Sequence, residues 1–300
     1  MRRSVLASAL SALLCWHAAP PPAVAQQGLF RSSVSVVRLD VLATDGRRPL
    51  TGLTAADFDL RDNGEPQSVE ALFAEHEPLD ILFAFDRSAS TRGDTIGHLR
   101  ESARAILAAL GSDDRAGLLV FNHTAQLVVP LGPAAAVSDA LDSITPEGAT
   151  ALFDAASVAL NLTAASTRRT LILLFTDGTD TLSWLPATTV LDGARTSDAV
   201  LYAVAMRDRT IARPIVDSGE SQMRRLSEST GGRLLRADDP AELRARFLDV
   251  LGEMRARYVL TYTPSSTAPG WHAVTVRVKS RSARVSARDG YSVPASSDQP

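Results

Sequence analysis

The middle of the chain constrains the fold most strongly, because short apolar runs alternate there with helical patterns. The apolar runs, which contain no polar alternation, are residues 81–85, 118–121, 171–175 and 200–205. Such runs are typical of strands that are covered on both faces, as in a parallel sheet. The clearest helical stripes between them are Leu99, Ala103, Ile106 and Leu110 and, later, Leu243, Phe247, Val250, Leu251 and Met254. This alternation predicts a doubly wound, Rossmann-like α/β domain over residues 79–257.

The regions on either side, residues 26–78 and 258–293, are predicted to consist of strands. In the first, Val37, Leu39 and Val41 alternate with polar residues at the period of a half-buried strand, and Asp45-Gly46 and Asp62-Asn63-Gly64 are turn signals. In the second, apolar residues alternate at 258–262 and again at 274–278, with a Pro- and Ser-rich loop between them.

Neither flanking region has enough strands to close a core of its own. We therefore expect the two to pair into one β-sandwich, with the α/β domain inserted between them. Chain ends of compact domains tend to lie close together, which makes such an insertion easy to build. Two separate small β units are the alternative.

The two ends of the chain are predicted to lie outside these domains. Residues 1–25 have the form of an export signal, with Arg2 and Arg3 before a short apolar stretch and Ala23-Val24-Ala25 as a cleavage site. An uncleaved anchor is the alternative, and residues 294–300 are expected to be disordered. Cleavage would give a periplasmic or secreted protein. It would also remove Cys15, the single cysteine, and with it any thiol chemistry.

Charge and hydropathy argue against two kinds of partner. The net charge of −3 and the lack of a long basic run give no general attraction to nucleic acid or to an anionic membrane. Nothing after the predicted signal supplies the roughly 20 uninterrupted apolar residues of a membrane span. We expect neither a nucleic-acid partner nor a stable membrane span.

Oxygen-bearing side chains follow two of the predicted strands. Asp86 ends the first, with Ser88 and Ser90 two and four residues later, and Asp177 ends the strand at 171–175. Thr150 comes just before a predicted helix, where its side chain can reach the same edge of the sheet. Open α/β sheets place their ligand sites at the carboxyl ends of the strands, so these five side chains are expected to converge.

This constellation resembles the metal-ion-dependent adhesion site (MIDAS) of von Willebrand factor A-type (VWA) and integrin I-type domains. That family has Asp-x-Ser-x-Ser after the first strand, Thr in a Gly-x-Thr loop, and Asp before Gly at the end of a later strand. The chain departs from it at Ala89, where Gly is usual, and at Thr91, where Met is frequent. Ala89 fits only if its φ is negative. Arg87, where a smaller residue is frequent, could face solvent or attract an acidic ligand.

Nearly all of the mature chain also resembles secreted bacterial proteins with a VWFA-related domain. The matching segments are 53–58 with 62–67 upstream of the α/β domain, and 257–264 with 288–291 downstream of it. This group is defined by architecture more than by activity, so the resemblance does not identify a ligand.

Hydroxyls and carboxylates without His or Cys favour a hard cation, Mg²⁺ first, with Mn²⁺ or Ca²⁺ possible. The resemblance implies that Ser88, Ser90 and Thr150 approach the cation directly, and that Asp86 and Asp177 act partly through water. It also implies an open position that accepts an Asp or Glu carboxylate of a partner protein. The sequence thus predicts a metal-dependent protein-binding or cell-adhesion module that is not an enzyme.

Other interpretations stay open at this stage. The chain could be a metal-independent assembly module of the cell envelope, with the five residues merely capping helices and satisfying turns. A Mg²⁺-dependent hydrolase is a further alternative, although the chain has no Gly-x-x-x-x-Gly-Lys or Gly-x-Ser-x-Gly motif and its histidines are scattered singly. Trp184 and Leu185, just beyond the Asp177 loop, could form an exposed contact patch, but Trp184 is expected to pack into the core. Oligomeric state is left open.

Overall fold

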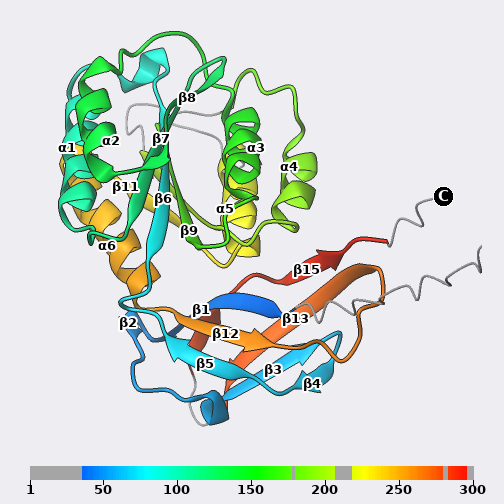
Figure 1. Cartoon of the computed structure of the whole chain (residues 1–300). Coiled ribbons are helices and arrows are strands. Elements are labelled where there is room, and N and C mark those ends of the chain that lie inside the picture. Colours follow the sequence, from blue (N-terminus) through cyan, green and yellow to red (C-terminus); the bar gives the residue numbers. More distant parts are fainter. Residues whose placement is uncertain (1–35, 178–179, 207–217, 280–282, 296–300) are drawn as a thin grey trace, which may run out of the picture. The chain divides into compact units, whose positions relative to one another are not determined.

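The computed structural model describes residues 36–177, 180–206, 218–279 and 283–295, all of which belong to one compact unit (Figure 1). The expected export signal at 1–25 and residues 296–300 of the expected tail lie outside the described residues. Within these ranges, no helix is long and apolar enough to cross a membrane.

A six-stranded sheet with the order β11-β10-β9-β6-β7-β8 lies at the centre of the α/β region. Its strands are β6 (Leu79–Asp86), β7 (Arg115–Phe121), β8 (Ala125–Gly132), β9 (Arg169–Thr176), β10 (Val200–Met206) and β11 (Leu234–Ala237). All neighbours are parallel except β8, which runs antiparallel to β7 at one edge. The four predicted apolar runs form β6, β7, β9 and β10. The two edge strands, β8 and β11, were not predicted.

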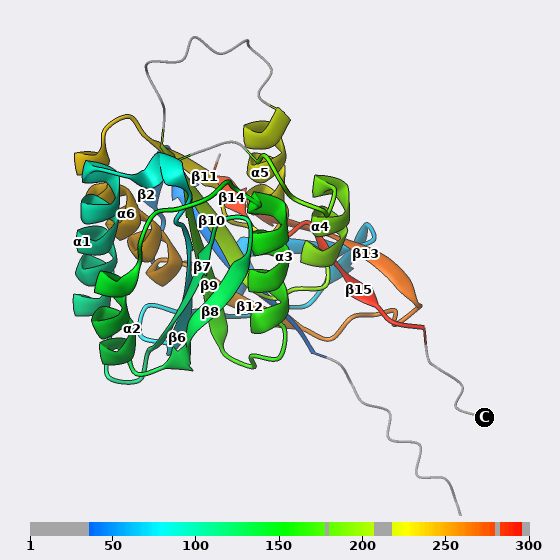
Figure 2. The ribbon, with the colours of Figure 1, turned by 90° about the horizontal axis from the view of Figure 1, so that it is seen from above.

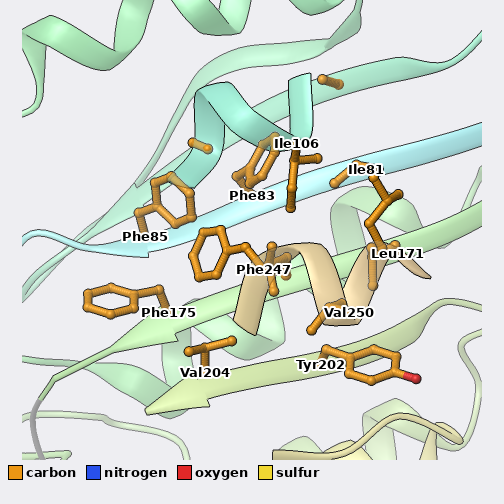
Figure 3. Close-up of a cluster of buried hydrophobic side chains, with 14 of the residues drawn as sticks. Ile81, Phe83, Phe85, Ile106, Leu171, Phe175, Tyr202, Val204, Phe247 and Val250 are labelled. Carbon is orange, nitrogen blue, oxygen red and sulfur yellow. The ribbon is translucent and has the colours of Figure 1, made fainter. Parts of the chain in front are cut away.

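Helices cover both faces of this sheet, as expected for a doubly wound domain (Figure 2). One face packs against α1 (Asp94–Ala108), α2 (Ala134–Ala140) and α6 (Leu243–Arg255), and the other against α3 (Leu152–Thr163), α4 (Ala187–Ala194) and α5 (Ser218–Ser229). Successive strand residues point to opposite faces. Phe83 and Phe85 of β6 therefore pack with Phe247 on the α1–α6 side (Figure 3), whereas Leu82 packs on the α3 side. The predicted stripes form α1 and α6, although Leu110 lies beyond the end of α1.

The flanking regions form two facing sheets. One has the order β14-β1-β12-β5 with β2 beside β1, and the other has the order β15-β13-β3-β4. The strands before the α/β region are β1 (Val37–Asp45), β2 (Arg48–Pro49), β3 (Phe58–Asp62), β4 (Glu65–Gln67) and β5 (Glu70–Phe73). Those after it are β12 (Tyr258–Tyr262), β13 (Gly270–Val278), β14 (Arg284–Ser286) and β15 (Gly290–Val293).

Each of the two sheets contains strands from both flanks. The central pairs are β1 with β12 and β3 with β13, both antiparallel, and residues of both sheets share one core. The predicted β-sandwich with an inserted α/β domain is therefore confirmed, and two separate β units are excluded. The predicted turn between β3 and β4 is also present. Asn63 and Gly64 have φ values of +49° and +87°, as a two-residue type I′ hairpin requires.

The outer face of β1 differs from the prediction, because it is covered and not exposed. Asp40 is only 9% exposed, and its Oδ1 accepts a hydrogen bond from Arg169 Nε at 2.7 Å. Arg169, at the start of β9, also donates to the carbonyls of Ala74 (2.9 Å) and Met254 (2.8 Å). The half-buried interpretation was wrong for Asp40 because a buried arginine from the inserted domain neutralises its charge.

Candidate functional site

Asp86 is the last residue of β6 and is fully buried. Its Oδ1 accepts a hydrogen bond from the backbone N–H of Ser88 at 2.8 Å, and its Oδ2 accepts one from Thr176 Oγ1 at 2.8 Å. Burial raises the pKa of this carboxyl, and the hydrogen bonds from Ser88 and Thr176 act in the opposite direction. Both oxygens are thus held in fixed positions at the carboxyl end of the sheet.

Ser88, Ser90 and Asp177 continue this network. Ser88 Oγ lies 2.9 Å from Ser90 Oγ, and Ser90 Oγ donates to Asp177 Oδ1 at 2.8 Å. Because β6 and β9 are adjacent and parallel, the loops that follow them meet. The structure therefore links four of the five residues singled out in the sequence through one run of hydrogen bonds.

Thr150 lies on a third loop, which is hydrogen-bonded to the Asp86 loop by its backbone. Ala89 N–H donates to Gly148 C=O at 2.9 Å, and Glu147 N–H donates to Arg87 C=O at 2.7 Å. Thr150 is only 4% exposed, yet its hydroxyl forms no hydrogen bond within the described part of the chain.

Gly148 has a backbone conformation in this loop that favours glycine. It has a φ of +76°, and a Cβ atom there would lie 2.6 Å from His123 Nδ1. The positive φ therefore favours glycine, and any other residue would also have to displace the exposed His123 side chain.

The two departures from the family pattern are accommodated locally. Ala89 has a negative φ, since Asn63 is the one non-glycine residue with a positive φ among those described. Thr91 is buried, and its Oγ1 donates to the Ser88 carbonyl at 2.9 Å, which fixes the turn that carries Ser88. Arg87 pairs with Glu147 at 2.7 Å, so its charge is balanced within the protein.

Helix capping does not account for Ser88 or Thr150. The Ser88 side chain makes no capping hydrogen bond to the short helix at 89–91. At the start of α3, the Leu152 N–H donates to Asp180 Oδ1 at 2.8 Å and the Phe153 N–H donates to Ser183 Oγ at 2.9 Å. The caps of α3 thus come from a loop about 30 residues later in the chain.

The donor set fits a small hard cation. In the described ranges, no group of three His, Cys, Asp or Glu side chains could hold a metal, so a cation here would depend on hydroxyl oxygens. Adjacent ligands of an octahedral Mg²⁺ site, with bonds of about 2.1 Å, lie about 3.0 Å apart. The Ser88 and Ser90 hydroxyl oxygens, 2.9 Å apart, match that edge, and Asp177 accepts a hydrogen bond from Ser90 at 2.8 Å, as a group that orients a ligand would.

A family model described as the von Willebrand factor type A domain matches residues 80–247, which is more than half of the chain. The chain belongs to the VWA family. Its α/β region, with the inserted position and the doubly wound sheet described above, is the VWA domain.

One curated relative is an uncharacterized protein, sll0103, from Synechocystis sp. It is 28% identical over 141 residues, which cover 42% of this chain and 33% of the relative. The chain thus matches about a third of that protein's length.

Solved structures share the fold at low sequence identity. A von Willebrand factor type A protein from Catenulispora acidiphila has a TM-score of 0.52 and 13% identity, and the match covers 81% of this chain and 74% of that one. Proximal thread matrix protein 1 from the mussel byssus has a TM-score of 0.51 and 15% identity, with 72% and 51% covered. The PilB minor pilin from Streptococcus sanguinis has a TM-score of 0.50 and 13% identity, with 60% and 62% covered.

Two residues near the site of this VWA domain were missed or misjudged from the sequence. Thr176 holds Asp86 Oδ2, and the only signal for it is its place between a buried strand and Asp177. Trp184 was expected to pack into the core, but it is 91% exposed. That prediction was wrong because the next residue, Leu185, is the one that packs, partly buried, against the hydrophobic cluster on this side of the sheet.

Proposed function

We propose that this VWA domain binds partner proteins through a divalent cation held at the Asp86 loop. The observation that carries the proposal is the hydrogen-bonded run from Asp86 through Ser88 and Ser90 to Asp177, beside the Thr150 hydroxyl, which has no hydrogen-bond partner in the described chain.

In this proposal the hydroxyls of Ser88, Ser90 and Thr150 hold the cation, Mg²⁺ first and Mn²⁺ or Ca²⁺ as alternatives. Asp86 and Asp177 orient these hydroxyls and bound water, and supply negative charge. When bound, the cation would supply a positive charge that accepts an Asp or Glu carboxylate of the partner. Binding needs only that open position, so catalysis is not part of the proposal.

We place this function outside the cytoplasm, in the periplasm or in the secreted fraction. The predicted export signal at residues 1–25 supports this placement. The shared fold of a minor pilin and a byssus thread matrix protein fits a role in attachment or assembly.

Water-proton relaxation of the Mn²⁺-loaded protein tests whether the open position accepts a carboxylate. The probe is the capped peptide acetyl-Gly-Glu-Gly-amide, and its matched control has Gln in place of Glu. We expect the Glu peptide to lower the relaxation rate in a saturable manner, because its carboxylate replaces water that exchanges at the cation. The Gln peptide should have little effect.

Equal effects of the two peptides would contradict the proposed mechanism. A relaxation rate that neither peptide alters would favour the metal-independent assembly module. Release of a product from the peptide, followed by mass spectrometry, would favour the hydrolase.

A further inference from the structure

Two large apolar side chains are exposed on the loop that follows Asp177. Trp184 is 91% exposed and Leu182 is 52% exposed. In the described part of the chain, no aromatic ring or cation covers Trp184, whereas Trp271 is 37% exposed and has the Arg195 guanidinium 5.0 Å from its ring centre. We call Leu182 and Trp184 the apolar rim.

The backbone of the loop that carries the apolar rim is hydrogen-bonded to Thr150 of the candidate cation site. The N–H groups of Thr181 and Leu182 both donate to the Thr150 carbonyl, at 2.9 and 3.0 Å. The Thr150 N–H donates in turn to Thr181 Oγ1 at 3.2 Å. Leu182 is therefore fixed by the same residue whose hydroxyl is proposed to hold the cation.

The rim is also held firmly without packing of its side chains. Trp184 N–H and Leu185 N–H donate to the two carboxylate oxygens of Asp154, at 3.0 and 2.9 Å, within the first turn of α3. Leu185 then packs into the core beside α3. These hydrogen bonds fix the backbone of Trp184. A partner that covers the indole would therefore have to order only the Trp184 side chain and not the loop.

We infer that the apolar rim is a specificity surface for the proposed protein ligand. The partner that we propose is a peptide segment that has an acidic residue and, two or three residues away, a large apolar side chain. Tryptophan is strongly enriched among residues that dominate binding energy, and exposed apolar groups beside a polar site mark interaction surfaces.

The spacing follows from the position of the loop beside Thr150. Asp154, which accepts hydrogen bonds from the Trp184 and Leu185 N–H groups, is the third residue of α3, about 3 Å of rise beyond Leu152. An extended peptide advances about 3.3 Å per residue, so a side chain two or three residues from the acidic one lies about 7–10 Å away, which is far enough to reach from Thr150 to the loop that is bonded to it. This inference rests on the proposed function, because the acidic residue is assigned to the cation.

The test is selection from a phage-displayed library of random heptapeptides on the whole protein in Mg²⁺. Wild-type protein should enrich peptides with Asp or Glu and with Trp, Phe or Leu two or three positions away. The variant L182S/W184A should keep the acidic preference and lose the apolar one. A matched control is Leu162→Ser, which removes a leucine that is 40% exposed further along α3.

A selected peptide should bind L182S/W184A at least about tenfold more weakly than wild type, while Leu162→Ser binds it as wild type does. Both variants should remain folded and lower the thermal midpoint by a similar small amount, because Leu162 and Leu182 are 40% and 52% exposed and Trp184 is 91% exposed. Lack of apolar enrichment on wild type, or apolar enrichment that survives in L182S/W184A, overturns the inference. Apolar enrichment without an acidic residue would instead contradict the proposed function.

Discussion

Replacing Arg169 with methionine is expected to lower the free energy of unfolding by about 3–5 kcal/mol. The change would leave the Asp40 carboxylate, 9% exposed, without its guanidinium partner. It would also leave the carbonyls of Ala74 and Met254 without the donors that Arg169 provides. Urea denaturation of the whole chain measures the loss.

The neighbouring residue provides the control. Arg168 has a side chain that is 30% exposed and pairs with Asp80, which keeps its bonds to Arg115 and Ser166 when Arg168 is lost. Arg168→Met should therefore cost about 1 kcal/mol. The double variant D40L/R169M should recover part of the loss, because no unpaired charge remains buried. Equal losses for Arg168→Met and Arg169→Met would show that the outer face of β1 is not closed as described.

Replacing Thr150 with valine is expected to weaken Mn²⁺ binding by about 100-fold or more, since loss even of a group that only orients a ligand costs 10–100-fold. Valine keeps the shape of threonine and removes the hydroxyl, which forms no hydrogen bond within the described residues. The fold should therefore survive, with a thermal midpoint close to that of wild type. Electron paramagnetic resonance of free Mn²⁺ gives the affinity.

Thr145→Val serves as the control, because Thr145 is exposed and precedes the same loop. It should bind Mn²⁺ as wild type does. If Thr150→Val retains wild-type affinity, then Thr150 does not hold the cation and the donor set is incomplete.

Local periodicity was sufficient to predict the doubly wound α/β domain. The apolar run at Ile81 to Phe85 predicted a strand, and the apolar stripe at 243–254 predicted the helix α6. The two elements pack against each other in the structure. The edge strand β8 escaped prediction because its exposure is irregular: it contains a register shift against β7 and is not covered on both faces.

Features that depend on distant residues could not be predicted from periodicity. The partner of Asp40 lies 129 residues later in the chain, so β1 has the pattern of a half-buried strand although both its faces are covered. In the same way, Asp180 and Ser183 cap α3 from about 30 residues away, and their loop holds Trp184 in solvent. The general preference of tryptophan for burial gave the wrong answer there.

The candidate site was accessible from sequence for a different reason. Asp86 and Asp177 each end a buried strand, and parallel strands bring such ends to one edge of the sheet. The sequence does not give the hydrogen bonds within the site, such as the one that Ser90 Oγ donates to Asp177 Oδ1.

Calorimetric titration of the whole chain with Mg²⁺ and with Mn²⁺ tests the central claim most directly. We expect one cation per chain for wild type and for Asp94→Ala, which removes an exposed carboxylate eight residues beyond Asp86. For Asp86→Ala we expect binding that is weaker by about 10–100-fold, because Asp86 orients the ligands of the cation. Wild-type protein that takes up neither metal, or Asp86→Ala that binds as wild type does, would contradict the account.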